Sequence, residues 1–122
     1  MNAAARSVAV SAALLSLVAL VLAAMGSHLF DLKGFRELWN TASGIHLFNA
    51  AALIGVSALL AHMSSPLLLR GAWLIILGTI VFCGSIYLHA ITGHAVPAVT
   101  PLGGLLMMTG WLLVALALMH KS

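Results

Sequence analysis

The sequence is poor in charge. Only 6% of its 122 residues are charged, five basic and two acidic, whereas 63% are hydrophobic. A soluble domain of this length carries roughly 30 charged side chains, about a quarter of its residues. Seven charged residues cannot cover a water-soluble surface. The composition therefore excludes a soluble globular domain and predicts that most of the chain lies in lipid.

Cysteine is scarce, and basic residues are not clustered. Cys83 is the only cysteine, which excludes an intramolecular disulfide and a cysteine-cluster metal site. The net charge is +3, but the five basic residues are scattered along the chain. They form no patch or stripe of the kind that phosphate binding requires. The composition therefore predicts no nucleic-acid partner.

Four long apolar runs predict four membrane-spanning helices. A span needs about 20 mostly apolar residues, and the runs cover approximately residues 8–28, 42–61, 66–92 and 101–119. We therefore predict an all-α, four-helix membrane bundle with short loops, one membrane domain over residues 1–122 and no soluble domain. A signal peptide is an alternative for the first run, which follows Arg6 and ends near Ala23-Ala24. That run is longer than the apolar segment of about 7–15 residues usual in signal peptides.

Residues typical of helix ends punctuate these runs. Ser65-Pro66 and Thr100-Pro101 each place a capping hydroxyl before a proline at the first helical position. Proline is tolerated there because its missing N–H would have no partner within the helix. Gly93 is predicted to stop the third helix, since glycine readily adopts the left-handed conformation that ends helices.

The tryptophans and the cysteine differ in their predicted surroundings. Trp39 and Trp73 lie near predicted span ends, as interfacial aromatic residues do. Trp111 lies in the middle of the fourth span and is predicted to pack against other helices. Cys83, near the middle of the third span, is predicted to be a packing residue.

Small residues recur along one face of each predicted span. In lipid, helices associate through close backbone approach and van der Waals contact, because burying leucine gains nothing over contact with acyl chains. The stripes therefore predict a compact bundle that packs through them, with left-handed crossings of about 20°. The stripes are Ala9, Ala12, Ser16, Ala19, Ala23 and Gly26 in the first span, Gly44, Ala51, Gly55 and Ala58 in the second, Gly71, Gly78, Ser85 and Thr92 in the third, and Gly103, Gly110 and Ala117 in the fourth.

The basic residues predict the orientation in the membrane. The two termini and the second loop share one side, which holds Arg6, Arg70 and Lys121. The first and third loops share the other side, which holds Lys33 and Arg36. Because the side richer in lysine and arginine faces the cytoplasm, we predict that both termini are cytoplasmic.

Histidines gather on the side of the first and third loops. His28 follows the first span, His46 lies about one turn into the second, His89 about one turn from the end of the third, and His94 in the third loop. Asn49 follows His46 by three residues. Both are therefore predicted to face the bundle interior.

Two interpretations of these polar residues stay open. In the functional one, several histidines converge to bind haem or a metal, with Met25 as a soft ligand suited to Cu(I), or to donate hydrogen bonds to a quinone. In the structural one, the histidines bond to backbone carbonyls, water or one another. No H-x-x-H or comparable spacing fixes two metal ligands on one helix, which favours the structural interpretation. The candidate cofactor-binding residues are His28, His46, Asn49 and His89, and no metal ligand is assigned.

The sequence shows no catalytic constellation. The only acids, Asp31 and Glu37, share one short loop with Lys33 and Arg36, where an ion-paired surface is the ordinary interpretation. Nucleophile elbows, glycine-rich phosphate loops and buried acid pairs are absent from the sequence. No charged residue lies in the central part of a predicted span, which argues against an ion-coupled transporter or pump acting alone. We therefore predict a protein that is not an enzyme.

Three blocks of the sequence resemble the family of small four-span membrane proteins that includes transmembrane protein 256 and domain of unknown function 423. The first block looks like the family's Gly-Ala-Phe-Gly-Ala-His at the end of span one, and the second like its aromatic-led entry into span two. This chain departs from the family at Met25, where members have an aromatic residue, and at Asn49, where many have histidine. The blocks are Ala24-Met25-Gly26-Ser27-His28, residues 39–53, and residues 82–93 followed by Thr100-Pro101-Leu102-Gly103-Gly104 and Gly110-Trp111.

The resemblance implies an integral membrane protein of the bacterial plasma membrane, or of a mitochondrial membrane in a eukaryote, and it supplies no activity or cofactor. The abundant close-packing surface and the absence of a catalytic set favour a small accessory or assembly partner of a membrane complex, or a homo-oligomer. The alternative is haem, copper or quinone binding through the histidines. A small-molecule transporter is less favoured, because the spans lack paired half-helix breaks.

Overall fold

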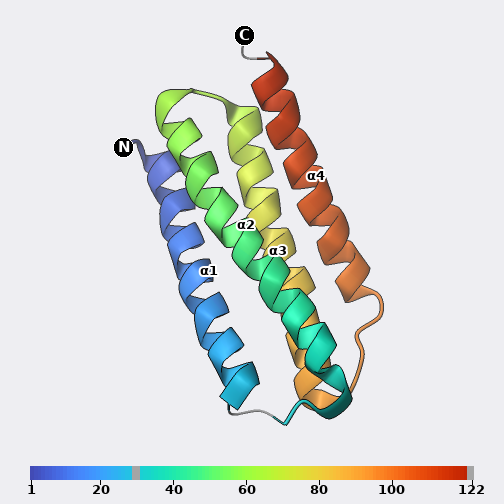
Figure 1. The fold of residues 1–122 in the computed structure, drawn as a ribbon. Helices are drawn as coiled ribbons and strands as arrows, with labels where there is room; N and C mark the ends of the chain where they lie inside the picture. Colours follow the sequence, from blue (N-terminus) through green and yellow to red (C-terminus); the bar gives the residue numbers. More distant parts are fainter. Residues whose placement is uncertain (29–30, 121–122) are drawn as a thin grey trace.

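The structure is a computed structural model that describes residues 1–28 and 31–120, and these residues form helices joined by short connections (Figure 1). The helices are α1 (Ala3–His28), the short 3₁₀ turn η1 (Lys33–Phe35), α2 (Arg36–His62), α3 (Pro66–Thr92) and α4 (Val99–His120). No strand occurs among the described residues. The prediction of an all-α membrane bundle is confirmed.

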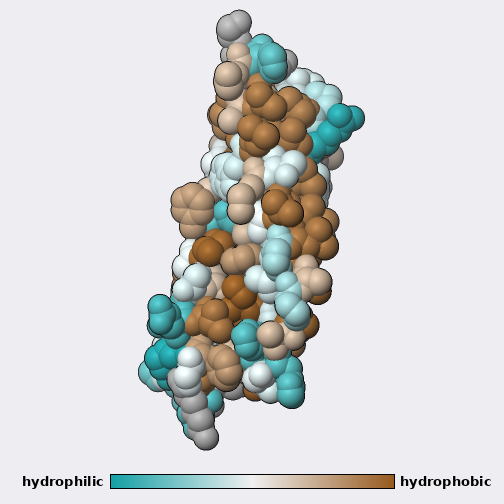
Figure 2. All heavy atoms as spheres, turned by 90° about the vertical axis from the view of Figure 1, so that its right-hand side faces the viewer, coloured by the Kyte–Doolittle hydropathy of each residue, from teal (hydrophilic) through white to brown (hydrophobic). Residues whose placement is uncertain are grey.

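Each of the four long helices can cross a bilayer. They contain 26, 27, 27 and 22 residues, and all four have the hydropathy of a membrane span. At about 1.5 Å per residue they are roughly 33–40 Å long, more than the hydrocarbon core of about 30 Å. The α4 face in Figure 2 is mostly apolar along its middle, and hydrophilic residues gather towards its two ends.

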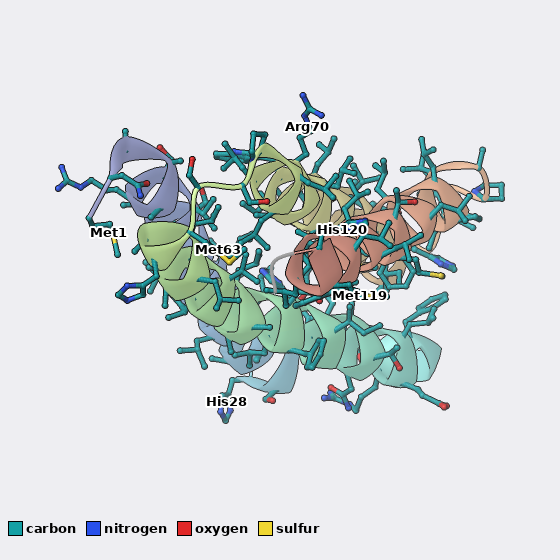
Figure 3. The ribbon with its side chains drawn as sticks, turned by 90° about the horizontal axis from the view of Figure 1, so that it is seen from above. Met1, His28, Met63, Arg70, Met119 and His120 are labelled. Carbon is teal, nitrogen blue, oxygen red and sulfur yellow. The ribbon has the colours of Figure 1, made fainter. Side chains whose placement is uncertain are left out.

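The helices run alternately up and down, so both ends of the chain and the α2–α3 connection lie at one end of the bundle (Figure 1). Close packing joins α1 to α2, α2 to α3 and α3 to α4, whereas α1 and α3 touch only sparsely. Helices α1 and α4 lie on opposite sides of the central α2–α3 pair (Figures 1 and 3). The bundle is therefore an open row with α3 between two different neighbours.

Two of the predicted helix ends are confirmed and one is wrong. The Ser65 hydroxyl accepts a hydrogen bond from the Leu68 N–H at 3.1 Å, with Pro66 in the first helical turn. Gly93 ends α3 in the left-handed conformation, at φ 76°. Thr100 does not precede α4 but lies within it. Its hydroxyl lies 2.6 Å from the Ser85 hydroxyl and so forms a hydrogen bond to the neighbouring helix α3 instead of capping α4.

The α3–α4 interface depends on the small residues predicted to form it. A Cβ added at Gly78 would lie 2.6 Å from the Met107 backbone nitrogen and 2.9 Å from the Gly103 carbonyl oxygen. A Cβ at Gly71 would lie 2.8 Å from the carbonyl oxygen of Gly110. The two backbones are thus too close for any larger side chain. The small-residue stripe of the fourth span is confirmed as a packing surface, and that of the third span is confirmed except at Thr92, which is exposed.

The stripes on α1 and α2 have opposite outcomes. Ala12 and Ala19 on α1 are fully buried, so the α1 prediction is confirmed. The α2 prediction is wrong for packing within the chain, because all four small residues of its stripe are exposed. Larger and polar residues occupy the buried face of α2 instead, at the same heptad spacing. The heptad positions of this face are Trp39, Ala42, His46, Asn49, Leu53, Val56 and Leu60, and Ala50 and Ser57 are buried beside them.

Candidate functional site

Trp39 lies inside the bundle, at the end where α1 and α2 meet. The sequence predicted an interfacial tryptophan, but Trp39 is only 1% exposed. Its indole N–H donates to the Leu22 carbonyl at 3.0 Å. The missing side chain of Gly26 makes room for the indole ring, which a Cβ at that position would overlap. Trp39 thus lies near the span end, as predicted, but Gly26 of α1 admits its ring into the core instead of leaving it exposed at the membrane interface.

A polar pair lies next to Trp39 in the core. The rings of Trp39 and Tyr87 are 4.7 Å apart and tilted by 57°. The Tyr87 hydroxyl lies 3.0 Å from His46 Nδ1, a hydrogen bond that joins α2 to α3. His46 is 4% exposed and Tyr87 6%. His46 Nε2 has no hydrogen-bond partner.

His46 forms part of an apolar pocket where α1, α2 and α3 meet. The pocket has a volume of about 160 Å³. Gly84 contributes open space, because a Cβ added there would meet no atom within 4 Å. The pocket is lined by Leu15, Val18 and Leu22 of α1, His46 of α2, and Thr79, Ile80, Cys83, Gly84 and Tyr87 of α3.

Asn49 belongs to a separate hydrogen-bond network that holds α2, α3 and α4 together. Its Nδ2 donates to Thr79 Oγ1 at 3.0 Å and to Met107 Sδ at 3.0 Å. Its Oδ1 accepts from the Trp111 indole N–H at 3.1 Å. Both amide protons and the amide oxygen are thus engaged within the protein. The predicted inward orientation of Asn49 is confirmed, and its hydrogen bonds join α2 to α3 and α4.

The remaining candidate residues lie away from the pocket. His28 is exposed at the end of α1 and points away from the bundle (Figure 3). His89 stacks near Phe35, with ring centroids 5.1 Å apart, and His94 is exposed in the α3–α4 connection. Among the described residues, no three histidine, cysteine, aspartate or glutamate side chains are placed to hold a metal ion. Of the four candidates, only His46 lines the pocket.

Tyr87 is the member of the site that the sequence did not single out. Two features of the sequence point to it. Tyr87 is the only tyrosine in the chain, and it lies inside a predicted span. A buried tyrosine hydroxyl ordinarily finds a hydrogen-bond partner, and in antiparallel neighbouring helices the histidine of α2 lies at a similar depth. To predict the His46–Tyr87 pair, one must know which helix faces are in contact, and composition does not reveal this.

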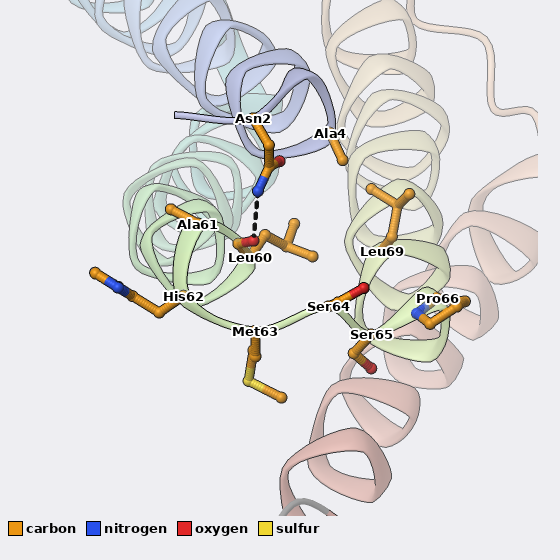
Figure 4. A pocket seen from close by; sticks show the side chains of 10 residues that line it. All are labelled: Asn2, Ala4, Leu60, Ala61, His62, Met63, Ser64, Ser65, Pro66 and Leu69. Atoms are coloured by element: carbon orange, nitrogen blue, oxygen red, sulfur yellow. Dashed lines mark hydrogen bonds between the residues drawn. The ribbon is translucent and has the colours of Figure 1, made fainter.

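A second hollow lies at the other end of the bundle, around the α2–α3 connection (Figure 4). It is larger, about 540 Å³. Asn2 closes one side of it. The Asn2 carboxamide oxygen accepts from the Ala5 N–H at 2.8 Å, and its Nδ2 donates to the Leu60 carbonyl at 3.1 Å. These contacts cap α1 and tie it to the end of α2.

The fold and the apolar surface define a multi-pass, four-helix integral membrane protein. The family described as "Protein of unknown function (DUF423)" matches residues 22–104, and the chain belongs to this family. The matched region contains the last turns of α1, all of α2 and α3 and the start of α4, including Trp39, His46 and Tyr87. The predicted family is confirmed.

Similar proteins occur in bacteria and in yeast. The chain is 29% identical to the UPF0382 membrane protein YwdK of Bacillus subtilis over 107 residues, which cover 84% of this chain and 87% of YwdK. It is 29% identical to the UPF0382 membrane protein SH2409 of Staphylococcus haemolyticus, over 86% of this chain and 88% of that protein. It is 32% identical to the UPF0382 membrane protein C1782.12c of Schizosaccharomyces pombe, over 82% and 91%. No solved structure matches the chain.

Proposed function

We propose that this membrane protein is a non-enzymatic accessory subunit that associates with another membrane protein through the exposed small-residue face of α2. This face consists of Gly44, Ala51, Gly55 and Ala58. All four residues are exposed, and a Cβ added at Gly44 or Gly55 would meet no atom within 4 Å. The single observation that supports the proposal is this unfilled face on a helix whose opposite side is fully packed.

The physical reason lies in how helices associate in lipid. Small residues favour association because they let another backbone approach closely. On α3 and α4, stripes of this kind meet each other at backbone contact, as the contacts of Gly71 and Gly78 show. The α2 face also consists of small residues, but none of the described helices packs against it. A helix of a partner protein would fill it in the same way.

We propose further that both termini lie in the cytoplasm of a bacterial plasma membrane. Arg6 and Arg70 are exposed near the end that holds the N-terminus and the α2–α3 connection. Arg36, at the other end, donates to the Gly26 carbonyl at 3.2 Å and so balances the C-terminus of α1. Labelling a cysteine introduced at Ser64, in a Cys83→Ala background, with a membrane-impermeant reagent tests this orientation. Labelling in intact cells would contradict it.

Partner association is tested by crosslinking in native membranes followed by affinity purification in mild detergent. We expect a partner at fixed stoichiometry with the wild-type protein. Ala51→Leu fills the α2 face and should remove the partner, whereas the matched Ala115→Leu on the exposed side of α4 should retain it. A monomer or self-oligomer alone in the wild-type sample, or equal capture by both variants, would contradict the proposal.

A further inference from the structure

We propose that the pocket between α1 and α3 is a lipid-facing binding site for a flat, apolar molecule that carries a carbonyl oxygen. The molecule enters from the bilayer and accepts a hydrogen bond from His46 Nε2. The site is separate from the α2 face proposed to bind a partner, since the four small residues of that face do not line the pocket.

The first argument is the unused polar atom. His46 lines the pocket and is 4% exposed, and its buried Nε2 has no hydrogen-bond partner. A buried polar group left without a partner costs about 1–3 kcal/mol, and the hydrocarbon core contains no water to compensate. A bound molecule with a polar atom at this position would supply the missing hydrogen bond.

The second argument concerns which atom that molecule must present. The Tyr87 hydroxyl at His46 Nδ1 is able to donate, and when it does, the imidazole proton lies on Nε2. In this tautomer, which the proposal adopts, Nε2 is the donor. The matching group on an uncharged, membrane-soluble molecule is a carbonyl oxygen.

The third argument is size and access. An apolar cavity of about 150 Å³ accommodates benzene, so the pocket of about 160 Å³ fits a single six-membered ring or an ester group. Sites for drug-sized ligands measure about 300–1,000 Å³, and this pocket is too small to enclose haem. Val18 is 46% exposed and Ile80 53%. Both residues line the pocket and also face lipid, so a tail attached to the ring would lie along this surface.

Two membrane components carry this chemistry: the ring of an isoprenoid quinone and the acyl ester of a bilayer lipid. They are distinguished with purified full-length protein in detergent without ester groups. One arm titrates decyl-benzoquinone and the other a diacyl glycerol ester, with thermal stability and tryptophan fluorescence as readouts. Saturable binding in the first arm assigns a quinone, and in the second a lipid ester. Binding in both arms supports the carbonyl site without selecting between them.

Variants test whether binding occurs in this pocket. Gly84→Leu places a side chain in the open space and should weaken binding at least about tenfold, because the ring loses its room. Ala115→Leu places a leucine at an exposed position of α4, away from the pocket, and should bind like the wild type. His46→Phe keeps a ring without the donor and should also weaken binding about tenfold. The proposal is overturned if neither probe binds, or if Gly84→Leu and Ala115→Leu bind equally well.

Discussion

The two sides of α3 use small residues in opposite ways. Towards α4, Gly71 and Gly78 bring two backbones into direct contact. Towards α1, contact is sparse, and Gly84 opens onto an apolar pocket. The same residue type therefore closes one interface and leaves space at the other. What decides the outcome is whether a neighbouring helix comes close enough to fill the gap.

The comparison also separates two kinds of buried polar residue. Asn49 is fully engaged through Thr79, Met107 and Trp111, and so fastens the α4 side. His46 is bonded on one ring nitrogen and unpartnered on the other, on the α1 side. A satisfied network specifies how helices pack. An incomplete one, next to a cavity, has room for a ligand.

The largest expected effect comes from Gly78→Leu, which breaks the closed side. The new side chain would meet the backbones of Met107 and Gly103 within 3 Å, and neither backbone can move without separating α3 from α4. Overpacking a well-filled core usually lowers the free energy of unfolding by about 1–3 kcal/mol. Because the new side chain meets backbone atoms here, we expect a loss at or above the upper end of that range. Thermal unfolding in detergent should show a large fall in stability or no folded protein. Unchanged stability would contradict the close packing of α3 against α4.

Asn49→Leu should have an intermediate effect, because it loosens the hydrogen-bond network that joins α2, α3 and α4. It removes three hydrogen bonds and leaves the Trp111 N–H without its acceptor. Hydrogen bonds between helices in a membrane average about 0.6 kcal/mol each, so we expect a loss of about 1–2 kcal/mol in the free energy of unfolding.

The control for Asn49→Leu is Thr109→Leu at an exposed position of α4, which should change stability by less than about 0.5 kcal/mol. Ligand binding at the pocket should persist in Asn49→Leu, because the His46–Tyr87 pair is intact. Loss of binding together with stability would mean that the two sides of α3 are coupled.

The helices themselves could be predicted from the sequence. Run length and hydropathy locate the spans, and Ser65 and Gly93 mark two ends of α3 through local chemistry. These signals depend only on neighbours along the chain. The inward stripes of α1, α3 and α4 were also predictable, because small residues at heptad spacing permit close approach.

The buried face of α2 could not be predicted in the same way. Lipid, unlike water, does not drive large apolar residues to the buried side of a helix. Two heptad faces of α2 were therefore candidates for the interface, the one of small residues and the one that includes Leu53 and Val56. The burial of Trp39 could not be predicted for a related reason, since it depends on Gly26 of another helix. His46 was a candidate from its residue type, but its partner Tyr87 and the adjoining pocket depend on how three helices meet.

The smallest expected effect on stability, and the sharpest comparison with Gly78→Leu, comes from Gly84→Leu. The two glycines lie six residues apart on α3, and the substitution is identical. At Gly84 a Cβ meets nothing within 4 Å, and replacing a helical glycine by leucine slightly favours the helix. The free energy of unfolding should therefore stay within about 0.5 kcal/mol of wild type or rise. Thermal unfolding of both variants in one detergent measures the difference. A loss of stability in Gly84→Leu as large as that in Gly78→Leu would show that α1 closes against α3 and leaves no pocket. A Gly84→Leu variant that is stable but no longer binds ligand would show that the two sides of α3 differ in function as well as in packing.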